Sequence, residues 1–204
     1  NLTYLYSKIR DGKTNRQDFV QYSNRILAML VEEALNFAPF TERKVHTPTD
    51  ADYDGFDLDM DHMCAVSIVR AGESMEEVCR QLMPGIRIGK ILIQRDEETA
   101  LPHLYYSKLP DNMPAQTVLL LDPMLATGGS AICAVDVLKK AGVKEEHIIF
   151  VNLVSCPEGV AALQKACPKM KMVTGEIDPI LNEKKYIVPG LGDMGDRYFG
   201  TAGN

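Results

Sequence analysis

The chain lacks the features that would direct it to a membrane or to nucleic acid. No apolar run approaches the roughly 18 residues that a membrane-spanning helix needs, and no signal-peptide pattern is present. The net charge of −6 argues against nucleic acid as the main partner, because binding along a phosphate backbone needs a basic surface. With 46% hydrophobic and 25% charged residues, the composition is typical of a soluble globular protein.

Paired cysteines are also missing. The five cysteines include no C-x-x-C pair, and most of them lie in apolar stretches. We therefore expect buried, reduced thiols in a cytoplasmic protein and no disulfides. The four histidines show no ligand spacing with these cysteines, which argues against a structural zinc site.

The length of 204 residues allows one domain with a sizeable hydrophobic core, and we expect a single domain over residues 1–204. The chain begins at Asn1 and not at a methionine. We expect it to be either a trimmed form or a piece of a longer polypeptide.

Alternating strand and helix patterns predict an α/β fold. An amphipathic pattern over 17–37 predicts a long helix within an N-terminal helical region of about 1–40. Continuous apolar runs predict buried strands, and helical patterns separate them. The strands are expected at 64–69, 88–94, 117–121, 147–153 and 170–174, and the helices at 75–82, 131–140 and 158–166. This order favours a mostly parallel central sheet flanked by helices.

Three segments fall outside this alternation. Residues 41–63 are acidic and rich in turn residues, so we expect a solvated connection or an edge hairpin, with a carboxylate metal site as the alternative. Residues from 95 to about 112 suit a protruding arm. The segment of about 178–204 is dense in glycine and proline but keeps apolar residues, which disfavours a floppy tail and predicts an ordered, loop-rich hood.

The most informative segment is the strand, loop and helix of residues 118–140. Four apolar residues end at Asp122, two adjacent glycines follow in the loop, and a helical pattern begins after Ser130. Backbone N–H groups at such a turn suit a phosphate, and an acid before the loop suits ribose hydroxyls. The loop lacks the lysine of a P-loop and the G-x-G-x-x-G spacing, so an ordinary strand-to-helix turn is the alternative.

Two further strand ends carry related chemistry. The run Arg70-Ala71-Gly72 follows one buried strand, and Arg95 with three acids follows the next. Either arginine can pair with an anionic ligand, although alone each segment also fits a surface turn or a salt-bridge cluster. Together with the loop at 122–130, these segments are three strand ends that we expect to converge on one anionic ligand.

The stretch from Tyr186 to Thr201 reads Y-I-V-P-G-L-G-D-M-G-D-R-Y-F-G-T. A flat pyrimidine carries alternating hydrogen-bond donors and acceptors around its rim. Backbone N–H and C=O groups match such a rim where glycine removes side-chain bulk. We interpret this stretch as a loop that packs over the site and binds a base.

These motifs, in this order, resemble uracil phosphoribosyltransferases over nearly the whole chain. D-P-M-L-A-T-G-G-S at 122–130 is similar to that family's loop for phosphoribosyl diphosphate (PRPP), and the final motif separates the uracil enzymes from purine and orotate relatives. Residues 67–75 and 87–95 look more like the eukaryotic forms. Many relatives carry two adjacent acids before the loop, whereas this chain has Leu121-Asp122-Pro123.

The resemblance implies a phosphoribosyltransferase-type fold and an activity in pyrimidine salvage. The 5-phosphoribosyl group of PRPP would be transferred to N1 of uracil, giving uridine monophosphate (UMP) and diphosphate. Uracil binding would involve Ile187, Gly192, Asp193 and Met194, mostly through their backbone. PRPP binding would involve Arg70, Ala71, Gly72, Arg95, Asp122, Pro123, Met124, Leu125, Ala126, Thr127, Gly128, Gly129, Ser130 and Asp193.

Within that set we expect catalytic roles for Asp122, Asp193 and Arg95. Asp122 would orient the ribose hydroxyls, directly or through Mg²⁺, while Arg70 and Arg95 would stabilise the departing diphosphate. Asp193 is the best-placed candidate for a general base, with an electrostatic or structural role as the alternative. Mg²⁺ would arrive with PRPP, and we expect no dedicated protein metal site.

The resemblance also bears on regulation and assembly. Some family members are tetramers activated by GTP, and the candidate effector contacts in this chain are Arg16, Arg25, Ala51, Asp52, Tyr53 and Asp54. For the two arginines, an ordinary place on a solvated helix is the alternative. We expect a homodimer or homotetramer that acts on small molecules, without a membrane or nucleic-acid partner.

Two other identities stay open. The chain could be a catalytically silent regulator that keeps the fold and binds PRPP or a nucleotide, although the loop at 122–130 has lost neither its acid nor its glycines. It could also be the C-terminal half of a bifunctional uridine kinase/uracil phosphoribosyltransferase, with the kinase ahead of Asn1. No kinase P-loop occurs within these residues.

Overall fold

A central, mostly parallel sheet organises the chain. The computed structural model describes residues 1–95 and 102–201. The strands run in the order β5-β4-β3-β6-β8-β7, and β9 pairs with β8. Their bounds are β3 Met63–Val69, β4 Arg87–Arg95, β5 Pro102–Lys108, β6 Thr117–Leu121, β7 Met124–Leu125, β8 Ile148–Ser155 and β9 Lys171–Ile177. Only β5 runs antiparallel, against β4. The predicted α/β class and parallel sheet are confirmed.

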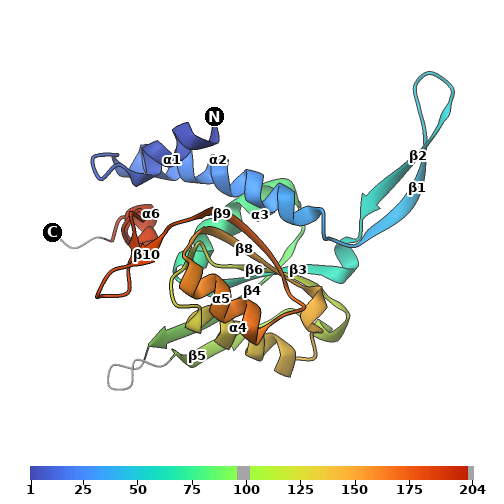
Figure 1. Cartoon of the computed structure of the whole chain (residues 1–204). Coiled ribbons are helices and arrows are strands. Elements are labelled where there is room, and N and C mark those ends of the chain that lie inside the picture. The colour runs from blue at the N-terminus through green and yellow to red at the C-terminus, as the bar shows by residue number, and fades with distance from the viewer. Residues whose placement is uncertain (96–101, 202–204) are drawn as a thin grey trace.

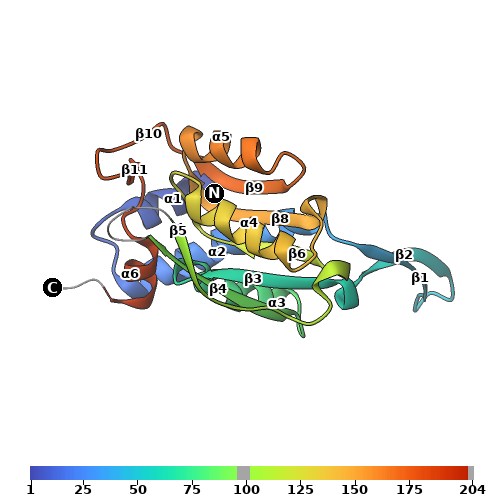
Figure 2. The same cartoon turned by 90° about the horizontal axis from the view of Figure 1, so that it is seen from below.

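Helices cover both faces of this sheet because its central strands are apolar on both sides (Figures 1 and 2). On one face lie α1 (Leu2–Arg10), α2 (Arg16–Leu35) and α3 (Glu76–Leu82), and on the other lie α4 (Gly129–Lys140) and α5 (Pro157–Ala166). Successive residues of β6 alternate between the two cores: Leu119 and Leu121 face α2, whereas Val118 and Leu120 face α4. The predicted strands and helices agree with the structure to within a few residues at their ends.

The acidic segment forms a hairpin of its own. Strands β1 (Phe40–His46) and β2 (Asp52–Leu58) pair with each other in a separate two-stranded sheet and project from the end of α2 (Figure 1). A hairpin was predicted, but its placement at the edge of the main sheet was wrong. Its carboxylates pair across the strands with basic side chains, as in Arg43 with Asp57, where nitrogen and oxygen are 2.9 Å apart.

The described part of the C-terminal segment, residues 178–201, is ordered, as expected for a hood. It contains β10 (Ile180–Leu181), β11 (Ile187–Val188) and α6 (Met194–Phe199). Asp193 caps α6 by accepting the Asp196 N–H at 2.8 Å. Helix α6 was not predicted, because three glycines in and around it disfavour helix. It forms because its apolar side packs on α2 and the core.

Smaller features complete the chain. Short 3₁₀ turns lie at Met60–His62, Ala71–Met75, Met113–Ala115 and Glu145–His147. The five cysteines are free thiols, four of them buried, as the sequence predicts. Of the arm predicted from 95 to about 112, the described part contains β5, which pairs antiparallel with β4, whereas residues 96–101 lie outside the described residues. Within the described ranges no helix is both long and apolar enough to cross a bilayer.

Candidate active site

Three strand ends meet at one edge of the sheet. Strands β3, β4 and β6 are parallel neighbours, so their carboxyl ends share that edge. Arg70 follows β3, Arg95 ends β4, and Asp122 follows β6. The convergence predicted from sequence therefore holds for the backbone of all three residues. The structure describes Arg95 through its backbone only, which pairs with Pro102.

The turn after β3 is packed tightly against β6. A Cβ added to Gly72 would lie 2.3 Å from the carbonyl oxygen of Leu121, so only glycine lets the two strand ends approach this closely. Below the turn, the Ser67 hydroxyl donates to the buried Glu76 carboxylate at 2.6 Å, and the Lys90 amine lies 3.3 Å from the same carboxylate. These contacts hold the turn after β3, which carries Arg70, in a fixed position next to β4 and β6.

The loop from Asp122 to Ser130 runs from the sheet into the N-terminus of α4. The Pro123 carbonyl accepts the N–H groups of Leu153 and Val154 at 3.1 and 2.9 Å, which holds the loop against β8. Gly128 adopts φ 85° and caps α4, and Gly129 is already its first residue. The loop thus presents a helix N-terminus toward the site edge, as predicted, although the helix begins earlier than expected.

The carboxyl group of Asp122 is buried at the base of this loop. It accepts the Met124 N–H at 3.3 Å, and the Asn152 amide donates to its backbone carbonyl at 3.0 Å. Burial raises the pKa of Asp122 to about 7, and the Met124 hydrogen bond offsets part of that shift. A buried carboxyl group that accepts one hydrogen bond among the described residues can accept further hydroxyl donors from a ligand.

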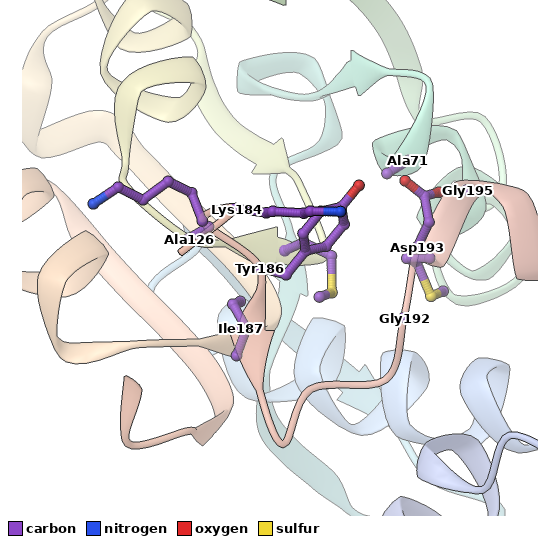
Figure 3. A pocket seen from close by; sticks show the side chains of 11 residues that line it. Ala71, Ala126, Lys184, Tyr186, Ile187, Gly192, Asp193 and Gly195 are labelled. Atoms are coloured by element: carbon purple, nitrogen blue, oxygen red, sulfur yellow. The ribbon is translucent and has the colours of Figure 1, made fainter. Parts of the chain in front are cut away.

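A cavity of about 320 Å³ lies between the loop, the Arg70 turn and the C-terminal hood (Figure 3). This size suits a small ligand. It is lined by Ala71, Met124, Ala126, Lys184, Lys185, Tyr186, Ile187, Gly192, Asp193, Met194 and Gly195. The four residues expected to bind uracil therefore share one cavity with three further residues expected to bind PRPP, namely Ala71, Met124 and Ala126.

Arg70 is already bound to acids in the structure. Its guanidinium donates to Asp196 and to the Thr201 hydroxyl, both at 2.6 Å, and lies 3.7 Å from Asp193. The Thr201 hydroxyl and the Arg70 guanidinium both hold the pKa of Asp196 below its usual range. The expected role as a counter-charge for diphosphate therefore requires Arg70 to exchange or share these partners, and its 44% exposed side chain is accessible for that.

Two cationic side chains at the cavity were missed by sequence reasoning. Lys184 and Lys185 lie in the turn between β10 and β11, and both line the cavity. In Figure 3 the Lys184 amine extends over the cavity beside Tyr186. Lys185 instead has its amine 3.7 Å from Glu158 of α5. Only their position next to the quoted Tyr186 motif could have drawn attention to them.

The candidate effector residues do not gather in one place within a chain. Arg16 opens α2 and donates to the Tyr198 carbonyl at 2.9 Å. The segment 51–54 lies on the β1–β2 hairpin beyond the other end of this 20-residue helix, which itself is about 30 Å long at 1.5 Å per residue. Arg25 lies between them on the exposed side of α2. A site built from all of them would need more than one copy of the chain.

No cluster of three or more His, Cys, Asp or Glu side chains that could hold a metal occurs within residues 1–95 and 102–201.

Comparison with known proteins assigns the family. A family model described as uracil phosphoribosyltransferase matches residues 1–201. The chain belongs to the uracil phosphoribosyltransferase family. It is 56% identical to the uracil phosphoribosyltransferase of Dictyostelium discoideum, over 97% of this chain and 91% of that protein. The resemblance drawn from the motifs is confirmed.

A solved structure and a longer relative extend the comparison. The AQ2163 protein of Aquifex aeolicus superimposes with a TM-score of 0.85 at 33% identity, over 97% of this chain and 93% of that one. Uridine kinase-like protein 4 of Arabidopsis thaliana is 48% identical over 97% of this chain, but the match spans only 42% of that protein. Chains of this family thus occur both nearly alone and within longer proteins.

Proposed function

We propose that the chain transfers the 5-phosphoribosyl group of PRPP to N1 of uracil, giving UMP and diphosphate. The family membership supports this reaction, and one structural observation indicates where in the chain it would take place. The cavity joins the glycine-rich loop at 191–195, the loop at 122–130 and the turn after β3 in a single space. A base and a phosphoribosyl donor can therefore meet there.

The uracil ring would lie against the backbone of Ile187, Gly192 and Met194. All three line the cavity, and Gly192 presents no side chain to it. Backbone N–H and C=O groups can match the donors and acceptors around the rim of a pyrimidine. Because these groups carry no charge, they suit a neutral base. Asp193 lines the same cavity and lies close to Arg70, so it can face the reacting end of PRPP.

The phosphoribosyl donor would span the two strand ends. The N-terminus of α4 and the loop from Ala126 to Ser130 would hold the 5-phosphate, and the buried Asp122 carboxyl would accept the ribose hydroxyls. Arg70 and Arg95 would carry the diphosphate. The negative charge that develops on diphosphate as its bond to C1 breaks is then stabilised by the two guanidinium groups.

Mg²⁺ would bind together with PRPP. It would neutralise charge on the leaving group, and Asp122 is the acid of the chain that we expect to lie near it. The chain itself would position the two reactants, with attack of N1 opposite the departing diphosphate and inversion at C1. Of the chain's acids, Asp193 is our candidate for removing the N1 proton.

Regulation and assembly are further proposals. We propose a homodimer or homotetramer, because the candidate GTP contacts at Arg16, Arg25 and 51–54 can meet only between copies. GTP would then activate through a site shared by neighbouring chains. The exposed hairpin that carries 51–54 is available for such a contact.

The test is product formation from PRPP and Mg²⁺ with each of uracil, cytosine, orotate, hypoxanthine and adenine, with and without GTP. UMP from uracil alone supports the proposal, and a faster rate with GTP supports the effector site. A folded chain that binds PRPP but forms no product with any base would instead favour the silent regulator.

A further inference from the structure

The loop that carries the base-binding backbone groups is held from behind by two arginines. This base loop comprises residues 188–194, between β11 and α6. Its side facing the cavity is lined by Gly192, Asp193 and Met194. Its other side meets α1 and the start of α2, which lie more than 170 residues earlier in the sequence.

Arg10 holds the first half of the base loop. One terminal nitrogen donates to the Gly190 carbonyl at 2.7 Å and to Asp178 at 2.8 Å, and the other donates to Asp178 and Glu176, both at 2.7 Å. Asp178 is buried, and it accepts the Gly190 N–H at 2.8 Å. Both backbone polar groups of Gly190 are therefore bonded within one Arg10–Asp178 pair.

Arg197 holds the second half. One of its terminal nitrogens donates to the Leu191 carbonyl at 2.6 Å and to the Ile9 carbonyl, and the other donates to the Asp11 carbonyl at 2.8 Å. Its guanidinium lies over the Phe19 ring, 4.1 Å from the ring centre. One side chain thus ties the base loop to the end of α1, to the turn after it and to α2.

Neither arginine lines the cavity, and both bond to main-chain groups within two residues of Gly192. A site that recognises a base through its backbone depends on where that backbone lies, and a misplacement of about 1 Å can cost on the order of 100-fold in rate. The loop at 122–130 lies on the other side of the cavity and makes none of these contacts.

We propose that Arg10 and Arg197 are positioning residues that fix the base loop and thereby set affinity for uracil far more than affinity for PRPP, whose expected contacts lie mostly outside this loop. The inference rests on the proposed function, since it assumes that the base loop binds uracil. It makes α1 part of the base site, although no residue of α1 touches the cavity.

The test compares Arg197→Met and Arg197→Lys with a matched control, Arg87→Met. Arg87 also bonds main-chain carbonyls, that of Asp61 at 2.7 Å, together with the Gln116 side chain at 2.9 Å, but near the amino ends of the strands. We expect Arg197→Met to raise KM for uracil at least tenfold or so, with KM for PRPP within about twofold of wild type. Arg197→Lys, which keeps the charge and can reach a carbonyl, should recover part of the loss. Arg87→Met should change neither KM.

Two results would overturn the proposal. One is an unchanged KM for uracil in folded Arg197→Met, and the other is an equal rise of both KM values. Amide hydrogen exchange gives a readout that does not need activity. Peptides covering 188–195 should exchange faster in Arg197→Met and in Arg10→Lys but not in Arg87→Met. If the wild-type chain makes no UMP, the proposed function fails, whereas the exchange comparison still decides whether the two arginines hold the loop.

Discussion

At the scale of single residues, the buried Asp122 carboxyl dominates the chemistry of the site. An ionised carboxylate normally keeps its charge by contact with water or with several donors. Within residues 1–95 and 102–201, this side chain accepts one hydrogen bond, from the Met124 N–H. The energetic cost of burial appears as the raised pKa of Asp122. A site that tolerates this cost gains an acceptor ready for ligand hydroxyls.

The raised pKa predicts how stability depends on pH. Asp122 has a pKa of about 7 in the fold, against about 3.9 for an unfolded chain. Between these values the folded state binds the extra proton, so stability falls as pH rises through this window. Three pH units correspond to roughly 4 kcal/mol as an upper bound. Urea unfolding of Asp122→Asn should lack this fall, whereas the surface variant Asp136→Asn should retain it.

The same group predicts a pH profile for catalysis. If ionised Asp122 accepts the ribose hydroxyls, kcat/KM for PRPP should rise with pH through about 7 and then level off. Asp122→Asn should lower turnover by about 100-fold or more with the fold intact, and should flatten this limb of the profile. A near-wild-type rate for the variant would count against the role of Asp122.

Gly192 gives a second prediction at this scale. Its φ of 84° strains any side chain, and a Cβ added there would lie 3.5 Å from Cδ of Arg197, so a larger side chain would push against the arginine that holds the base loop. Gly192→Val should abolish uracil use while PRPP binding persists. The control is Gly85→Val, at φ 91° on a surface turn with open space around it. It carries the same backbone strain, so uracil use should survive there, and equal losses in both variants would contradict a base slot at Gly192.

At the scale of elements, the β10–β11 hairpin adds a cation to the cavity. The Lys184 amine extends over the cavity (Figure 3), while the Lys185 amine lies near Glu158. We expect Lys184→Gln to raise KM for PRPP several-fold, because PRPP is the highly charged reactant. Lys185→Gln removes the same charge one residue away and should have little effect. Equal effects would mean that only overall charge matters.

The helices, strands and loops also show which features of the fold can be predicted from sequence patterns. The parallel strands, the loop at 122–130 and an ordered hood were predictable, because apolar runs and glycine–acid spacing are local signals. The Arg10–Asp178 contact joins residues 168 positions apart, and that of Arg197 with Ile9 joins residues 188 apart. Contacts between residues so far apart produce no periodic pattern in the sequence from which they could be predicted. Asp178 alone offered a signal, as an acid directly after the parallel strand β9.

At the scale of the whole molecule, the β1–β2 hairpin stands away from the body (Figure 1) and exposes large side chains. Tyr53 is 63% and Phe56 is 67% exposed. We expect contact with a second copy to cover these rings. In sedimentation velocity, Phe56→Asp should lower the oligomer mass, whereas Leu2→Asp on α1 should not. An unchanged mass for Phe56→Asp would remove the hairpin from the interface.

One cavity brings together the base loop and the loop at 122–130. A crystal structure with UMP bound tests it most directly. We expect the pyrimidine to contact the backbone of Ile187, Gly192 and Met194, and the 5′-phosphate to bind the N–H groups at 127–130. UMP bound elsewhere, or with its base in the loop at 122–130, would contradict the assignment.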